Sequence, residues 1–168
     1  MKEETSFNFN MSALRVWTLL TDLNGFSRWH PVYRMNGVAE LGAEVDVSWL
    51  LFKGDRRLTT QLIVNKLEKP KAIGWEMGIP GLLIFDERYD IAPVANGVCV
   101  HHAVECRGVF GGLLGRFIRR GLRRTMRHQD AAFLTFLRRQ SRLPRPIARP
   151  HQRPGKPPRS GGAANDRH

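Results

Sequence analysis

The sequence predicts an α+β fold made of a strand, two short helices, six further antiparallel strands and a long C-terminal helix. Near the N-terminus and in six later segments, apolar and polar residues alternate with the period of a half-buried strand. Two other segments carry apolar residues at helical spacing. Glycine, proline and asparagine separate the strand-like segments by only a few residues, which favours hairpin connections.

The N-terminal part contains the first strand and both short helices. Residues 5–11 alternate between polar and larger side chains and predict a strand. Ser12 is a suitable N-cap, and apolar residues recur at helical spacing after it, so a helix is predicted over residues 13–23. A second short helical turn should end before Pro31, because proline disfavours helical geometry in the residue that precedes it.

The remainder of the domain is predicted to be six strands and one helix. The helix runs from about Gly112 to Gln140, with its larger apolar residues near one face. The predicted strands cover residues 32–40, 44–53, 56–67, 72–77, 82–92 and 98–107.

Two motifs give the chain a resemblance to a known superfamily. Residues 16–31 read V-W-x-L-L-x-D-x-x-x-F-x-x-W-x-P, and residues 102–108 read H-x-x-E-x-x-G. Together with the element order, this resembles the START-like (SRPBCC) superfamily of polyketide cyclases/dehydrases, which has the Bet v 1-like helix-grip fold. The resemblance covers about residues 4–140, and Cys106 departs from it, since those proteins often carry an aromatic residue there. It implies a curved antiparallel sheet of about seven strands wrapped around the C-terminal helix, with an internal cavity.

Length and composition predict one domain and a tail. Residues 1–140 are enough to bury a core, whereas residues 141–168 are rich in proline, arginine and glycine and are expected to be a disordered basic tail. The N-terminus lacks the features of a secretory signal, so a cytoplasmic location is expected. Cys99 and Cys106 lie too far apart on one predicted strand to form a disulfide. No metal-binding spacing is present, and neither a metal nor a cofactor is expected.

Basic charge is concentrated in the C-terminal part. Residues 1–107 hold 12 Lys and Arg against 13 Asp and Glu, whereas residues 108–168 hold 15 against 2. On the long helix Asp130 is the only acid, although an ordinary solvated face mixes both signs. The arginines therefore form either a solvated face or a surface for a polyanion, either RNA or an anionic membrane, with peripheral attachment at the inner membrane face. The polyanion-binding candidates are Arg116, Arg120, Arg123 and Arg127.

Candidate catalytic residues lie on the last two predicted strands. The valines that alternate with His102 mark its face as the buried one. Glu87 shares a face with Tyr89 and apolar neighbours, so either it is a carboxylate in the cavity or the predicted phase of this strand is wrong by one residue. If these strands are neighbours, His102, Glu87 and Tyr89 form a proton-transfer set in an apolar pocket. The alternative is a set of hydrogen bonds that fixes a ligand or the core.

The pocket itself is predicted from inward-facing strand residues and the closing helix. Trp75 resembles the central-strand tryptophan of the superfamily. Gly121 is included because glycine inside a helix is unfavourable unless it makes room for something. The candidate ligand-binding residues are Trp49, Leu51, Thr60, Leu62, Trp75, Phe85, Tyr89, His102, Phe117 and Gly121.

The resemblance implies that the protein binds a hydrophobic small molecule, such as a lipid, quinone, isoprenoid or polyketide, for transport or presentation. Two alternatives stay open. One is an aromatase/cyclase-type enzyme acting on a polyketide-like substrate, although no nucleophile motif or phosphate-binding loop supports an enzyme. The other is a module that docks on a membrane or on RNA through its basic helix and tail.

A chain that ends at Gln140 is expected to keep its thermal midpoint within a few degrees of the full-length value. Residues 141–168 offer little apolar area for burial, so their removal costs little stability. Thermal unfolding of the two chains, followed by circular dichroism, measures the difference. A large fall in the midpoint would contradict a disordered tail.

Overall fold

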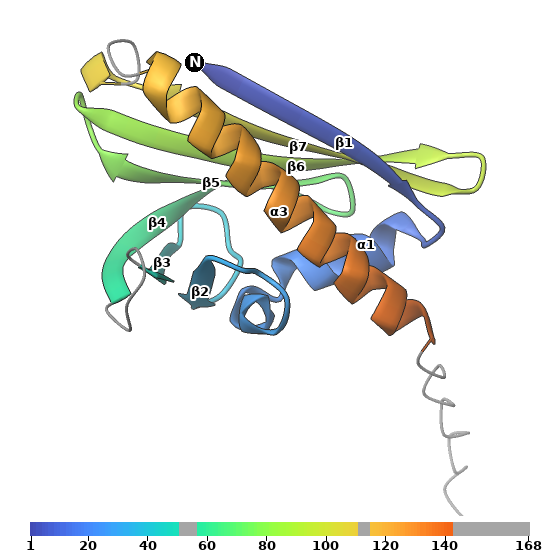
Figure 1. Cartoon of the computed structure of the whole chain (residues 1–168). Coiled ribbons are helices and arrows are strands. Elements are labelled where there is room, and N and C mark those ends of the chain that lie inside the picture. The colour runs from blue at the N-terminus through green and yellow to red at the C-terminus, as the bar shows by residue number, and fades with distance from the viewer. Residues whose placement is uncertain (51–56, 111–114, 143–168) are drawn as a thin grey trace, which may run out of the picture.

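The computed structural model describes residues 1–50, 57–110 and 115–142. A seven-stranded antiparallel sheet forms one layer, and helix α3 (Gly115–Arg142) lies across one face of it (Figure 1). Helix α1 (Ala13–Thr21) and the 3-10 helix η1 (Leu23–Arg28) pack on the same face near the C-terminal half of α3. This arrangement confirms the predicted fold class.

Each strand pairs with its neighbours in the antiparallel direction, and the sheet order is β1-β7-β6-β5-β4-β3-β2. The first strand therefore pairs with the last, while all the other pairs are consecutive hairpins. The strands are β1 (Lys2–Phe9), β2 (Tyr33–Asn36), β3 (Glu44–Leu50), β4 (Arg57–Glu68), β5 (Ala72–Ile79), β6 (Leu83–Val94) and β7 (Gly97–Arg107).

Some element boundaries differ from the predicted ones, and the sheet explains the main difference. β1 begins at Lys2 rather than at residue 5, because its pairing with β7 extends to Lys2 opposite Glu105. β2 ends at Asn36 instead of residue 40, and the following residues form turns that lead into β3. Ser12 holds the expected N-cap position, but its side chain makes no capping hydrogen bond.

Aromatic residues of the 3-10 segment join the sheet to α3. Phe26 is fully buried and contacts Trp75 of β5 edge-on, with ring centroids 5.7 Å apart. Trp29, just after η1, contacts Phe26 at 4.7 Å and Phe133 of α3 at 4.6 Å. The proline-terminated aromatic segment is thus the plug between the helices and the concave face of the sheet.

The strand phase predicted for β7 is confirmed, since Val98, Val100, His102, Val104 and Cys106 are all buried. Both cysteines are free, as their spacing predicts. Within the described ranges, no helix combines the length and apolar character needed to cross a membrane. In the same ranges, no group of three or more His, Cys, Asp or Glu side chains is arranged to hold a metal ion.

Candidate functional site

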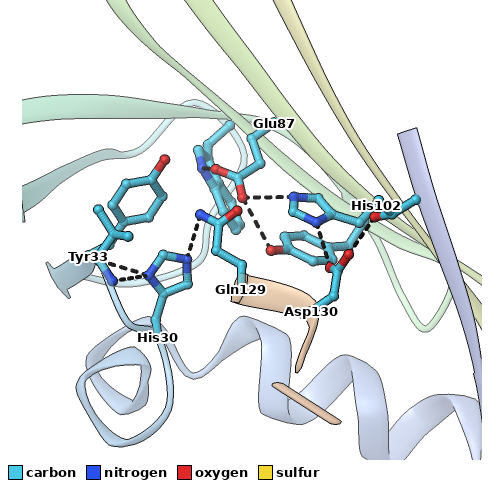
Figure 2. Close-up of polar contacts among 10 residues, drawn as sticks. His30, Tyr33, Glu87, His102, Gln129 and Asp130 are labelled. Carbon is cyan, nitrogen blue, oxygen red and sulfur yellow. Dashed lines mark hydrogen bonds and ion pairs between the residues drawn. The ribbon is translucent and has the colours of Figure 1, made fainter. Parts of the chain in front are cut away.

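A row of three buried ionisable side chains lies between the sheet and α3. His102 Nε2 lies 3.0 Å from Glu87 Oε1, and His102 Nδ1 lies 2.8 Å from Asp130 Oδ1. These residues come from β7 (His102), β6 (Glu87) and α3 (Asp130), and Figure 2 shows the imidazole between the two carboxylates. Glu87 and His102 face the same side because residue 87 pairs opposite Val104 and Tyr89 opposite His102.

Neutral donors complete the hydrogen bonding of the carboxylates. Tyr89 donates its hydroxyl to Glu87 Oε1 at 3.2 Å, and Trp75 donates its indole N–H to Glu87 Oε2 at 3.3 Å. On the other side, Thr5 of β1 donates to Asp130 Oδ2 at 2.5 Å. These bonds offset part of the cost of burying charge, which is large for an unpaired carboxylate.

The geometry places a positive charge on His102. Burial lowers its pKa, but the hydrogen bonds to Asp130 and Glu87, together with their negative charges, raise that pKa to about 9. Burial raises the pKa of Glu87, yet the hydrogen bond and charge of His102 outweigh burial and hold it below its usual value. At neutral pH the row is therefore carboxylate, imidazolium, carboxylate, with a net charge of about −1.

A second buried histidine has the opposite character. His30 has a pKa lowered to about 4, mainly because burial disfavours the charged ring. Its Nδ1 accepts the backbone N–H of Tyr33 at 2.8 Å, so the proton of the neutral ring is on Nε2. The Gln129 amide has its nitrogen 3.0 Å from Nε2 (Figure 2), but two N–H groups cannot hydrogen-bond to each other, so the amide must be turned to let its oxygen accept this proton. Its NH2 group is then directed away from His30, and Figure 2 shows Glu87 on that side.

An apolar wall extends from this polar cluster along the concave face of the sheet. Tyr33 stacks on His30 with centroids 4.3 Å apart and meets Trp49 edge-on at 5.3 Å, so it links the cluster to the wall. Strand pairing puts the wall residues on one face, and they are half-buried or exposed although they point inward. We define the apolar wall as Tyr33, Trp49, Leu58, Thr60, Ile79, Leu83 and Phe85.

The structure brings most of the predicted site residues together. His102, Glu87 and Tyr89 form the cluster, and the remaining strand residues of the prediction lie on the same concave face: Trp49, Thr60, Leu62, Trp75 and Phe85. Leu51 and the side chain of Phe117 lie outside the described part of the chain.

The prediction that Gly121 lines the pocket is wrong. Gly121 is exposed, and a Cβ at this position would meet nothing within 4 Å. Met126 and Phe133 mark the buried face of α3. Successive residues of an α-helix are rotated by about 100°, so Gly121 does not point in the same direction as its half-buried neighbour Leu122.

Three members of the polar cluster were missed from the sequence as site residues: His30, Gln129 and Asp130. Asp130 carried the clearest signal, since it is the only acid on a helix rich in arginine. His30 lies inside the W-H-P turn, where its neighbours drew attention to aromatic packing alone. Gln129 gave no signal, because a glutamine on a polar helix is ordinary.

The basic face of α3 is partly neutralised by β1. Arg119 and Arg123 both bind the carboxylate of Glu3, which is only 6% exposed, and they lower its pKa. Arg123 is thus paired with Glu3, although about half of its side chain stays exposed, and its part in a polyanion-binding surface stays a prediction. Arg120 and Arg127 are exposed and stay candidates, whereas the side chain of Arg116 is outside the described part.

Fold and site together define an α+β domain whose sheet closes over a helix and presents an apolar concave face. A family model described as polyketide cyclase / dehydrase and lipid transport matches residues 2–136. The chain belongs to this family, which confirms the resemblance seen in the sequence. A comparison with curated proteins gives no match.

Solved structures share the fold at low sequence identity. The protein of unknown function SA2116 from Staphylococcus aureus is 9% identical, with a TM-score of 0.68 over 85% of this chain and 96% of that one. Protein NE0264 from Nitrosomonas europaea is 11% identical, with a TM-score of 0.67 over 84% and 97%. TTHA0849 from Thermus thermophilus is 14% identical, with a TM-score of 0.60 over 79% and 93%. These similarities show the fold alone.

Proposed function

We propose that the protein binds an oxygen-containing hydrophobic small molecule against the apolar wall, between the concave face of the sheet and α3. The observation that best supports this proposal is that apolar side chains on the inner face of the sheet are open to solvent, with Leu58 51% and Ile79 61% exposed. Contiguous apolar surface of this kind is typical of a binding site. Membership of a family that includes lipid-transport proteins supports the same conclusion.

A polar atom on the wall also fits a ligand. The indole N–H of Trp49 is buried and has no hydrogen-bond partner among the described residues. A buried donor without a partner is unfavourable by about 1–3 kcal/mol, and a ligand oxygen would satisfy it. This is the basis for an oxygen-containing molecule rather than a pure hydrocarbon.

Filling the ligand space at the apolar wall is expected to weaken binding, whereas an equal change on the outer face of the sheet leaves binding unchanged. Thr60 is on the concave face opposite Val47, and its neighbour Thr59 is exposed on the outer face opposite Ser48. Thr60→Phe should weaken binding of the neutral fluorescent probe N-phenyl-1-naphthylamine by at least tenfold, because the new ring occupies ligand space. Thr59→Phe is the matched control and should bind the probe like the natural protein.

Probe titration of the three proteins, with near-ultraviolet circular dichroism as a check on folding, makes the comparison. Mass spectrometry of a lipid extract from the purified protein would identify any ligand that is retained. Equal probe binding by folded Thr60→Phe and Thr59→Phe proteins, or no probe binding by the natural protein, would contradict this site.

The enzyme alternative is supported by the same polar cluster, because a carboxylate and an imidazole lie beside an apolar wall. The geometry favours recognition over catalysis, however. Both ring nitrogens of His102 are held by carboxylates, so neither has a free lone pair to remove a proton from a substrate. His102 therefore acts by holding Glu87 and Asp130 in place. The ligand meets the row at its Glu87 end.

A further inference from the structure

The charge at the inner end of the apolar wall limits which ligands can bind there. Glu87 and Asp130 contribute two negative charges, and the imidazolium between them contributes one positive charge. Glu3 is also buried, but Arg119 and Arg123 neutralise it. Among the described residues, no lysine or arginine is buried. An anionic group brought to this end would therefore meet a net negative charge with little water to screen it.

The remaining hydrogen-bonding capacity at this end is also of one kind. Both nitrogens of His102 and both oxygens of Asp130 already have partners. Each oxygen of a carboxylate accepts about two hydrogen bonds. Glu87 is already bound by Trp75, Tyr89 and His102, and the Tyr33 phenol is also hydrogen-bonded to it. The acceptor that remains for a ligand is the Tyr33 oxygen, which keeps lone pairs when its proton is donated to Glu87, so the complementary ligand group is a donor.

Tyr33 lies at the junction of the polar cluster and the apolar wall. Its hydroxyl group also favours a ligand group that donates a hydrogen bond. Burial and the negative charge of Glu87 raise the pKa of its phenol well above the usual value, so it remains protonated. A phenol beside a carboxylate turns its proton toward the charge and presents its lone pairs outward. It then offers an acceptor to a ligand.

We propose that this site selects neutral amphiphiles whose inner end is a hydroxyl group, and that it rejects carboxylates and phosphates there. This inference rests on the proposed function and narrows it to hydroxylated hydrophobic molecules. Fatty acids and phosphorylated lipids are excluded from binding with the head group inward. The basic charge of the chain does not reverse this preference, because the described arginines of α3 are exposed or bound to Glu3.

Displacement of bound N-phenyl-1-naphthylamine by three ligands with the same carbon number tests the selection. 1-Decanol has a hydroxyl donor, 2-decanone has an acceptor only, and decanoate is an anion at pH 7.5. We expect 1-decanol to bind at least 30-fold more tightly than decanoate and about tenfold more tightly than 2-decanone. Decanoate binding as tightly as 1-decanol would overturn the exclusion of anions. Equal binding of 1-decanol and 2-decanone would overturn the donor requirement.

Removing the negative charge of Glu87 tests whether this carboxylate is the cause of the selection against anionic ligands. Glu87→Gln should reduce the preference for 1-decanol over decanoate to less than fivefold, whereas Asp86→Asn, on the outer face of β6, should leave it unchanged. An unchanged preference in a folded Glu87→Gln protein would overturn the assignment to this carboxylate. If Glu87→Gln does not fold, the comparison of ligands on the natural protein still decides the selectivity. Failure of the probe itself to bind would instead refute the proposed function.

Discussion

His102→Ala is expected to lower the free energy of unfolding by about 3–5 kcal/mol. The substitution leaves Glu87 and Asp130 buried without the cation that lies between them, and removing one partner of a buried ion pair is destabilising by about this amount. It also removes a ring that stacks on Tyr89 with centroids 4.2 Å apart. Urea unfolding monitored by tryptophan fluorescence measures the change.

His101 provides the matched control. It is adjacent in sequence, but it is exposed on the outer face of the sheet. His101→Ala should change stability by no more than about 0.5 kcal/mol, as is usual for surface substitutions. A His102→Ala protein as stable as His101→Ala would show that the row of charges contributes nothing to the fold. In a double-mutant cycle, His102→Ala combined with Glu87→Ala should cost less than the sum of the two single changes, because each leaves the other residue unpaired.

Stability is expected to be highest near pH 6.5 and to fall on both sides. The pKa of His102 is about 9 in the folded protein against 6.5 for an unperturbed histidine, so its contribution is complete below pH 6.5 and is lost as pH rises to 9. The pKa of His30 is about 4, so its contribution is complete above pH 6.5 and is lost as pH falls to 4. Each shift corresponds to about 3 kcal/mol at roughly 1.4 kcal/mol per pH unit.

Glu87 adds to the loss on the acid side. Its pKa is held below the usual value, so its stabilising contribution is present above the unfolded pKa and disappears as pH falls. Urea midpoints at pH 5, 6.5 and 8.5 define the curve. His102→Gln should flatten the alkaline side, and His30→Gln should flatten the acid side. A natural protein that is as stable at pH 8.5 as at pH 6.5 would contradict an imidazolium at position 102.

The order of the elements and the phase of the strands follow from local residue patterns. Side chains alternate along a strand whatever surrounds it, so the valines of β7 were enough to place His102 inward. The same rule placed Glu87 and Tyr89 on one face of β6. The hairpin between these strands is local, and the short turn at residues 95–97 favours the pairing that the structure shows.

The partners of those inward side chains come from distant segments of the chain. Asp130 and Gln129 come from α3, and their contact with the cluster depends on how that helix crosses the sheet, which no local pattern specifies. The incorrect placement of Gly121 also concerns the orientation of α3. Each residue of a helix is rotated by about 100° from the one before it, so a position next to a buried residue can lie on the exposed face. Arg123 looked free for the same reason, since its partner Glu3 is 120 residues away in sequence. Strand periodicity is a local property, whereas the pairing of charges across the core is set by packing between distant segments.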